Sequence, residues 1–241
     1  MGLSDLFKKS GAAPKCSAVI VAAGSSTRMG SDKLLADLGG MPVLARTLQS
    51  FESSDYVSEI VVVTRMDRVS EIADLCAEYK FGKVSKVIAG GKTRMESSLI
   101  GVSAVKTSAK LIAIHDAARP LVTEAVIKRT VCAAAQYMAA VPVIPSVDTL
   151  KVVSEKDRIV GTIDRNTVYR VQTPQVFDAV LIKGALTKAS EKGLALTDDS
   201  AAMDMTGFQT YTVAGEEDNI KITTPRDLII AEAILKSRDM A

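Results

Sequence analysis

The stretch Ser17-Ala-Val-Ile-Val-Ala22 is a continuous apolar run that leads directly into Ala22-Ala-Gly-Ser-Ser-Thr-Arg-Met-Gly30 and then Ser31-Asp-Lys33. An apolar run that ends at a glycine turn is typical of a strand buried on both faces, as in a parallel sheet covered by helices. Small residues after such a strand let backbone N–H groups approach an anion, and Arg28 and Lys33 add two positive charges. The stretch therefore predicts the first strand of an α/β sheet, with an anion-binding loop at its carboxyl end.

The loop matches neither of two common phosphate-binding fingerprints. Five residues separate Gly24 from Gly30, and Ser31-Asp32 precede Lys33, whereas the Walker A pattern needs four intervening residues and then Lys at once. The loop also lacks the middle glycine of the dinucleotide fingerprint, which disfavours a nicotinamide dehydrogenase. A plain strand–helix turn with solvated charges therefore stays an alternative for the loop taken alone.

Short apolar runs alternate with longer helical patterns along the rest of the chain. The expected strands are 60–63, 84–89, 111–115, 139–144 and a later one near 211–214. The expected helices are 43–51, 69–79, 94–105, 123–137, 179–192 and 225–236. This order predicts a three-layer, Rossmann-like α/β fold with a mostly parallel sheet.

One segment departs from this texture. Residues 150–154 and 158–163 alternate around the polar turn 155–157, which predicts a β-hairpin. Such an inserted hairpin either covers the sheet or projects as an arm that pairs with another subunit. We expect a flexible leader over 1–15, a single domain over 16–241, and an arm at about 148–172.

The composition excludes several classes of function. The chain has 241 residues, a formal net charge of +2 and one histidine, and its aromatic content is 4% without Trp. Near-balanced charge and few aromatics argue against a nucleic-acid partner. A single histidine excludes a site with two His ligands and weakens any Ser-His or Cys-His catalytic arrangement. An enzyme or small-molecule binder that works through Lys, Arg and Asp remains.

The cysteines and the hydropathy pattern bear on location. Cys16, Cys76 and Cys132 form no CxxC pair, so we expect reduced thiols in the cytoplasm. No apolar run approaches the roughly 18 residues that a membrane span needs. We therefore expect no membrane partner.

Two further strand ends carry polar groups. Gly90-Gly91 with Ser97 follows the expected strand 84–89, and Asp116 with Arg119 follows 111–115. An Asp at such a position can hold a divalent cation, whereas the lone His115 is expected to pack or bond locally. Together with Arg28 and Lys33, these residues suit a nucleoside triphosphate bound with Mg²⁺ along one edge of the sheet.

The motifs at and beyond these positions carry a family resemblance. The Ala-Ala-Gly-x-x-x-Arg-Met-Gly opening resembles nucleotidyltransferases of the glycosyltransferase-A-like fold. Five later motifs are similar to those of the 2-C-methyl-D-erythritol 4-phosphate cytidylyltransferase (IspD) family: His115-Asp-Ala-Ala-Arg-Pro120, Asp164-Arg-Asn166, Gln172-Thr-Pro-Gln175, Thr197-Asp-Asp-Ser200 and Asn219-Ile-Lys-Ile-Thr223. The resemblance runs from about Ser17 to Leu235 and makes 16–241 a single nucleotidyltransferase domain.

The resemblance implies transfer of CMP from CTP to 2-C-methyl-D-erythritol 4-phosphate, a step of isoprenoid precursor synthesis, with Mg²⁺ as cofactor. The implied catalytic cations are Arg28, Lys33 and Lys221. The implied nucleotide-binding residues are Ala22, Ala23, Gly24, Ser25, Gly91, Arg94, Ser97 and Ala117. The implied metal ligand is Asp116, with Asp218 as a second candidate. The implied acceptor-binding residues are Arg119, Thr149, Arg165, Thr173 and Thr197.

The resemblance also implies a homodimer, in which the arm crosses to the other subunit and brings Arg165 and Thr173 to its site. Lys33-Leu34-Leu35 departs from the Lys-Gln frequent in the family and is commoner in molybdenum-cofactor cytidylyltransferases, which lack the Asp164-Arg-Asn and Thr173-Pro-Gln blocks. Two alternatives stay open: a ribitol-5-phosphate cytidylyltransferase, with another polyol phosphate as acceptor, and a non-catalytic nucleotide-binding protein.

Overall fold

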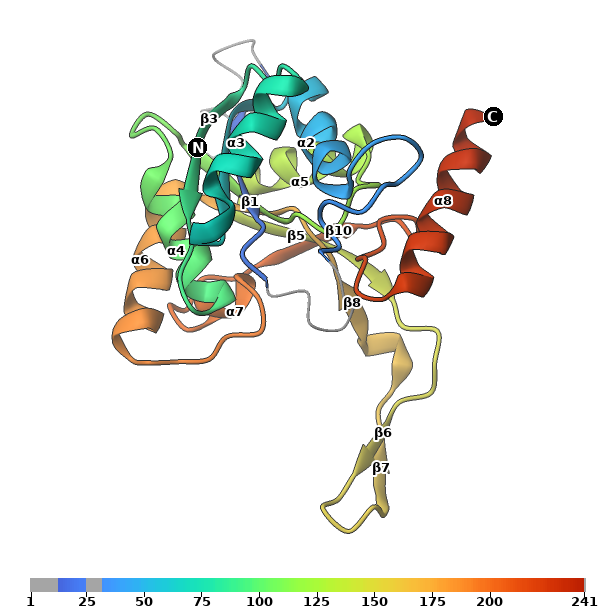
Figure 1. Cartoon of the computed structure of the whole chain (residues 1–241). Coiled ribbons are helices and arrows are strands. Elements are labelled where there is room, and N and C mark those ends of the chain that lie inside the picture. Colours follow the sequence, from blue (N-terminus) through green and yellow to red (C-terminus); the bar gives the residue numbers. More distant parts are fainter. Residues whose placement is uncertain (1–12, 25–31, 241) are drawn as a thin grey trace.

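The computed structural model describes residues 13–24 and 32–240, and within them one eight-stranded sheet forms the centre of the molecule (Figure 1). Its order is β10-β5-β9-β4-β1-β2-β3, with β8 also paired to β5. The strands are β1 (Cys16–Val21), β2 (Val57–Thr64), β3 (Val84–Ala89), β4 (Leu111–Asp116), β5 (Ala139–Pro145), β8 (Tyr169–Val171), β9 (Gln175–Asp178) and β10 (Tyr211–Ala214). The predicted α/β sheet is thereby confirmed.

β1 lies inside the sheet between β2 and β4 and runs parallel to both. Ala18, Val19 and Ile20 are completely buried because helices cover both faces of the strand. The register pairs Val21 with Asp116 of β4. The carboxyl ends of β1 and β4 therefore lie side by side, at one edge of the sheet.

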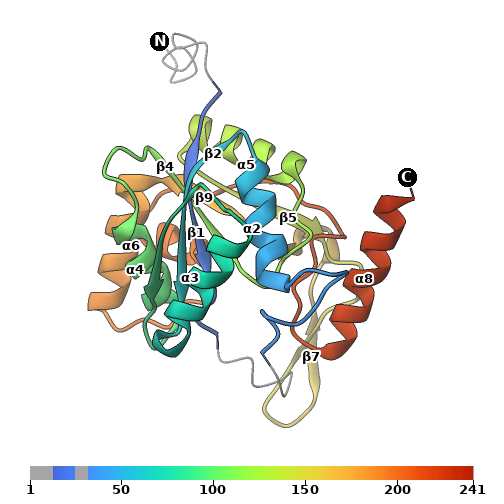
Figure 2. The same cartoon turned by 45° about the horizontal axis from the view of Figure 1, so that its top comes forward.

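Helices cover the two faces of the sheet and complete three layers (Figures 1 and 2). One cluster of buried side chains draws on α2 (Val43–Ser53), α3 (Val69–Glu78), α5 (Glu124–Tyr137) and α8 (Pro225–Asp239). The cluster on the other face draws on α4 (Arg94–Ala104), α6 (Ala179–Glu191) and α7 (Ser200–Asp204). Two short 3-10 turns, η2 (Met66–Arg68) and η3 (Arg165–Thr167), join other elements. No helix in 13–24 or 32–240 has the length and apolar character that crossing a membrane requires.

The strand β9 was not predicted from the sequence. It is only four residues long and passes directly into α6, so it shows no periodicity of its own. It runs antiparallel between β4 and β5, with Phe177 opposite Ile112 on one side and Ala139 on the other. This direction carries the residues just before Gln175 to the carboxyl end of β4.

The predicted hairpin is present as β6 (Lys151–Val153) and β7 (Ile159–Thr162), which pair only with each other among the described residues. Figure 1 shows the hairpin projecting away from the three layers. Apolar side chains on it face solvent, with Ile159 and Val160 65% and 63% exposed. The projecting part is shorter than the expected 148–172, because β8 already pairs with β5.

Candidate active site

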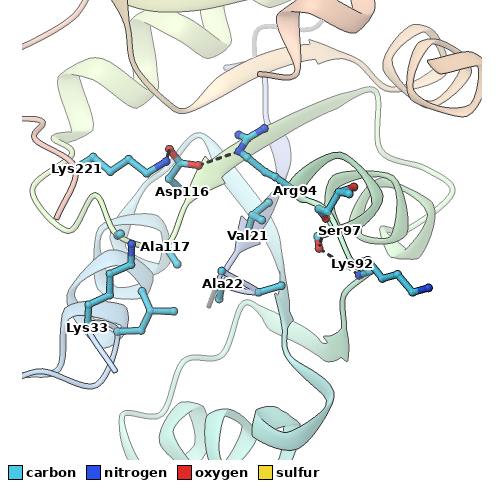
Figure 3. Close-up of a pocket in the computed structure, with 15 residues that line it drawn as sticks. Val21, Ala22, Lys33, Lys92, Arg94, Ser97, Asp116, Ala117 and Lys221 are labelled. Atoms are coloured by element: carbon cyan, nitrogen blue, oxygen red, sulfur yellow. Dashed lines mark hydrogen bonds and ion pairs between the residues drawn. The ribbon is translucent and has the colours of Figure 1, made fainter. Parts of the chain in front are cut away.

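A cavity of about 310 Å³ opens at the carboxyl ends of β1 and β4 and the start of α4 (Figure 3). It brings together ten of the predicted site residues, namely Ala22, Ala23, Gly24, Lys33, Gly91, Arg94, Ser97, Asp116, Ala117 and Lys221. In Figure 3, Lys33 and Lys221 enter from one side and Arg94 from the other. Segments far apart in the sequence thus converge on one concave site, which is where open α/β sheets bind ligands.

Apart from Asp218, which is described with the predicted metal ligands below, the remaining predicted residues fall into three groups. Ser25 and Arg28 lie outside the described residues. Arg119 and Thr173 adjoin the cavity through contacts with Asp116 but do not line it. Thr173 is buried at the site of its own chain, where it contacts His115 and Asp116, whereas the resemblance implied that the arm brings it to the other subunit. Three others are exposed and lie away from the cavity lining: Thr149, Arg165 of η3, and Thr197 before α7.

Asp116 is the only acidic residue in the described lining of the cavity, and cations surround it. Its Oδ1 lies 3.2 Å from Arg94 Nε, and its Oδ2 lies 2.9 Å from Lys221 Nζ and 3.6 Å from Arg119 Nε. Burial disfavours the charged carboxylate, but the cations outweigh that cost and hold the pKa of Asp116 well below its usual range. Asp116 is therefore ionised at neutral pH, and the cations exceed it in charge. Such a cavity favours a polyanion.

The Gly90-Gly91 turn is shaped by close packing. A Cβ at Gly90 would lie 2.6 Å from Ser97 Oγ, and one at Gly91 would collide with Glu96 Cβ. The buried Ser97 hydroxyl donates to Thr93 O and accepts from Gly91 N–H. Thr93 in turn caps α4 by accepting from Glu96 N–H. These contacts fix the first turn of α4, from which Arg94 reaches Asp116.

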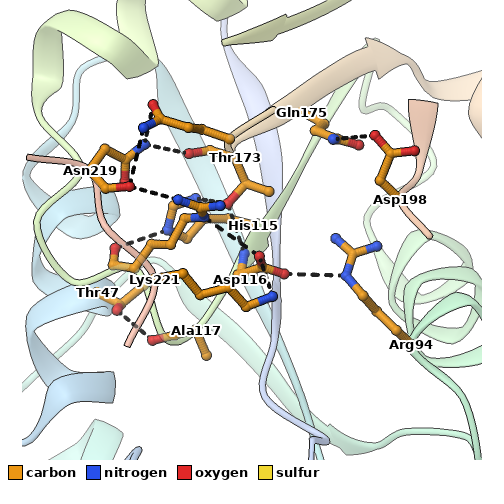
Figure 4. Close-up of polar contacts among 12 residues, drawn as sticks. Thr47, Arg94, His115, Asp116, Ala117, Thr173, Gln175, Asp198, Asn219 and Lys221 are labelled. Carbon is orange, nitrogen blue, oxygen red and sulfur yellow. Dashed lines mark hydrogen bonds and ion pairs between the residues drawn. The ribbon is translucent and has the colours of Figure 1, made fainter. Parts of the chain in front are cut away.

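His115 is a structural residue at the site. Its Nε2 lies 3.2 Å from Arg119 O, which can only accept, and its Nδ1 lies 3.0 Å from Thr173 Oγ1 (Figure 4). A neutral ring with the proton on Nε2 satisfies both contacts, because Thr173 then donates to Nδ1 and accepts from Asp116 N–H. Burial lowers the pKa of His115 to about 3. The ring therefore holds the backbone around Asp116 and does not move protons at neutral pH.

This burial predicts how stability depends on pH. The pKa of His115 is about 3 in the folded state and about 6.5 in the unfolded chain. The unfolded chain binds the proton more tightly, so the stability from this group is complete above pH 6.5 and falls as pH drops. The expected slope is about 1.4 kcal/mol per pH unit.

Urea unfolding of the wild type and His115→Gln at about pH 7, 6 and 5 measures this difference. We expect the wild type's advantage to shrink as the pH falls, because the variant lacks the titrating ring. An advantage that stays constant over this range would contradict the assignment.

The loop that carries Lys221 is fixed by amide side chains. Gln172 Oε1 accepts from Glu216 N–H, and its Nε2 donates to Glu216 O at 2.7 Å. Asn219 Nδ2 donates to Thr173 O, while Asn219 O accepts from Arg119 Nη1 at 2.6 Å. Gln172 and Asn219 belong to recognised motifs, but nothing in the sequence assigned them these roles. Their contacts join segments 44 or more residues apart, which no local pattern reveals.

The predicted metal ligands do not come together. The carboxylate of Asp218 pairs with Arg238 at 3.3 Å and does not line the cavity. Within 13–24 and 32–240, no cluster of three or more His, Cys, Asp or Glu side chains could hold a metal ion. Asp116 is thus the one carboxylate of the described cavity lining that could contact a cation.

Comparisons with known proteins agree on one family. The profile described as 2-C-methyl-D-erythritol 4-phosphate cytidylyltransferase matches residues 16–237. Curated proteins of that name from Halalkalibacterium halodurans and Caldanaerobacter subterraneus are each 41% identical, over 92% and 91% of this chain and 98% of each relative. The crystal structure of a 4-diphosphocytidyl-2C-methyl-D-erythritol synthase from Anaerococcus prevotii has a TM-score of 0.83 and 32% identity, covering 92% of this chain and 96% of that one.

Proposed function

The chain belongs to the 2-C-methyl-D-erythritol 4-phosphate cytidylyltransferase family, and on that basis we propose how its cavity performs the family's reaction. The enzyme transfers CMP from CTP to 2-C-methyl-D-erythritol 4-phosphate and releases pyrophosphate. This reaction belongs to isoprenoid precursor synthesis. The observation that best supports the proposal is the cluster of Arg94, Arg119 and Lys221 around the carboxylate of Asp116, with Lys33 in the lining of the same cavity, at the edge where α/β sheets bind ligands.

The chemistry needs cations rather than a base. An oxygen of the acceptor phosphate, already anionic at neutral pH, attacks the α-phosphorus of CTP in line. The bond from this phosphorus to the bridging oxygen breaks, and pyrophosphate leaves with the electron pair. The barrier comes from repulsion between two polyanions and from charge that develops on the phosphoryl oxygens, and preorganised cations lower both. Lys33 and Lys221 line the cavity on one side and supply this charge. We assign the same role to Arg28, which lies outside the described residues.

The donor set fits a divalent cation that protein and nucleotide bind jointly. Mg²⁺ commonly takes one or two carboxylates together with substrate phosphates and water, and Asp116 supplies one carboxylate. Arg94 and Lys221 also contact its two oxygens, so a cation there would share the carboxylate with them. When bound, Mg²⁺ neutralises part of the triphosphate charge.

We assign the acceptor phosphate to the side of Asp116 that faces Arg119. Thr149, Arg165 and Thr197 are exposed, so within one chain they do not enclose a ligand. A second copy of the chain whose arm reaches this cavity would bring Arg165 to it. Such a homodimer would also cover the apolar side chains of β6 and β7, which a lone chain leaves in water.

The substrate CTP and the three free thiols support a cytoplasmic location.

The arm makes a testable prediction about assembly. Ile159→Glu places a charge on the exposed apolar side of the hairpin, so we expect a dimer to become a monomer with reduced activity. Size-exclusion chromatography with light scattering measures the mass. Val180→Glu is the matched control, because Val180 is 79% exposed on α6 and makes no part of the arm. If the Ile159→Glu variant is still a dimer, or if the wild type is a monomer, the arm does not form the dimer interface.

The choice of acceptor is tested by turnover. Purified protein with CTP and Mg²⁺ receives 2-C-methyl-D-erythritol 4-phosphate or, separately, ribitol 5-phosphate, and pyrophosphate release is followed. We expect release with the methylerythritol phosphate. Release with ribitol 5-phosphate alone would assign the other acceptor, and release with neither would leave a nucleotide-binding protein without this activity.

A further inference from the structure

We propose that Asp199 is a positioning residue of the nucleotide site. It holds the Arg94 guanidinium so that only Nε contacts Asp116. The inference rests on the proposed function, because it concerns the pocket for CTP. Asp199 belongs to the Thr197-Asp-Asp-Ser200 motif, and no step of the reaction described above uses its carboxylate. Asp199 does not line the cavity, so it acts through Arg94.

Arg94 lies between two carboxylates that come from different parts of the chain. Its Nη1 lies 2.8 Å from Asp199 Oδ2, and its Nε lies 3.2 Å from Asp116 Oδ1. The contact with Asp116 has hydrogen-bond geometry, whereas the contact with Asp199 is the shorter ion pair, and the Asp199 side chain is only 1% exposed. Two charged contacts from different segments therefore hold the guanidinium, one at the cavity wall and one from the buried side.

The backbone that presents Asp199 is itself held by β9. Gln175 Oε1 accepts from the N–H groups of Asp199 and Ser200, each at 3.1 Å, and its Nε2 donates to Asp198 Oδ2 at 2.9 Å (Figure 4). Gln175 is 1% exposed and lies opposite Ile114 of β4. The turn that carries Asp199 is thus tied through β9 to β4, the strand that ends at Asp116, so the spacing of the two carboxylates is set by the sheet.

The charges explain why this spacing matters. Burial raises the pKa of the Asp199 carboxyl, and the permanently charged Arg94 guanidinium opposes that shift. If Asp199 lost its charge, Asp116 would be the remaining carboxylate in contact with Arg94 in the described structure. Arginine pairs with a lone carboxylate preferentially through a two-bond fork. The guanidinium would then close over Asp116 and withdraw both groups from an incoming nucleotide.

The test is Asp199→Asn, which keeps the shape of the side chain and removes its charge. We expect the KM for CTP to rise about 10-fold to 100-fold, by analogy with the loss seen when residues that orient metal ligands are replaced, with a smaller change in kcat. Calorimetric titration with CTP and Mg²⁺ measures the same loss without turnover. Glu59→Gln is the matched control: Glu59 is a 1% exposed carboxylate that binds Ser17 and Ser85 within the sheet. It should lower the melting temperature and leave the KM for CTP unchanged.

A double-mutant cycle separates positioning from a general structural effect. If Asp199 acts through Arg94, Asp199→Asn should cost nothing further in an Arg94→Gln background. A folded Asp199→Asn variant with wild-type affinity for CTP would overturn the proposal, as would a loss that is undiminished without Arg94. If Asp199→Asn does not fold, Gln175→Leu takes its place in the same measurements. This variant loses the hydrogen bonds that hold the turn carrying Asp199, but it keeps every charge. Absence of turnover in the wild type would count against the proposed function, whereas the CTP titration still judges the role of Asp199.

Discussion

The Lys33→Ala variant is expected to lose a factor of about 10²–10³ in kcat, as other enzymes do when one preorganised electrostatic contact is removed. Lys33 lines the cavity opposite Arg94, on the segment that follows the glycine loop. Its positive charge cannot be replaced by water, because water would have to reorient as charge develops on the phosphoryl oxygens. The side chain is only half-buried, so the melting temperature should change little. Pyrophosphate release at saturating CTP and acceptor measures kcat directly.

The matched control is Lys183→Ala, which removes the same charge from an exposed position on α6. The control should keep full activity, which separates the local effect from the change in net charge. If Lys33→Ala retained near-normal kcat at an unchanged melting temperature, Lys33 would not be a catalytic residue.

The Lys221→Met variant is expected to show a loss of similar size, about 10²–10³ in kcat, for a different local reason. Lys221 Nζ is 2.9 Å from Asp116 Oδ2, so this lysine both supplies charge and holds the carboxylate. Asp116 keeps its contacts with Arg94 and Arg119, and Lys221 is 38% exposed. The folded structure should therefore tolerate the change, which single-turnover kinetics and a thermal melt on the same sample can show.

Lys236→Met on α8 is the comparison for Lys221, because it is an exposed lysine in the same C-terminal part of the chain. A loss below tenfold for Lys221→Met would mean that the charge near Asp116 is redundant. If the only effect is a raised KM for the acceptor, Lys221 contributes to binding of the acceptor in the ground state and not to stabilisation of the transition state.

The sequence predicted those parts of the fold that leave a local pattern. The buried strand β1 was predicted because its apolar run is unbroken, and the hairpin was predicted because its residues alternate around a polar turn. β9 was missed because four residues show no period before α6 begins. Its place between β4 and β5 depends on pairing with strands that lie far earlier in the chain, and a single sequence does not show such pairing.

The same distinction applies to the cavity. Lys33, Asp116 and Gly91 follow predicted strands, so their shared edge could be predicted from the rule for parallel sheets. The supporting contacts of Gln172, Gln175 and Asp199 could not, because each is a hydrogen bond or ion pair between distant segments. His115 was expected to pack or bond locally, and its contact with Arg119, four residues along the chain, agrees with that expectation. Its contact with Thr173 joins residues 58 positions apart and was not predicted.

The position of β9 has a consequence for biosynthesis. A nascent chain that has emerged only as far as β5 cannot complete the sheet, since the strand that joins β4 to β5 is still inside the ribosome. Until residues 175–178 emerge, β4 and β5 each expose an unpaired apolar edge, which is the kind of surface that chaperones bind and that aggregates. Lys221 emerges later still. The chain is therefore committed to folding late in translation, and a truncation before β9 should yield an aggregating fragment rather than a smaller enzyme.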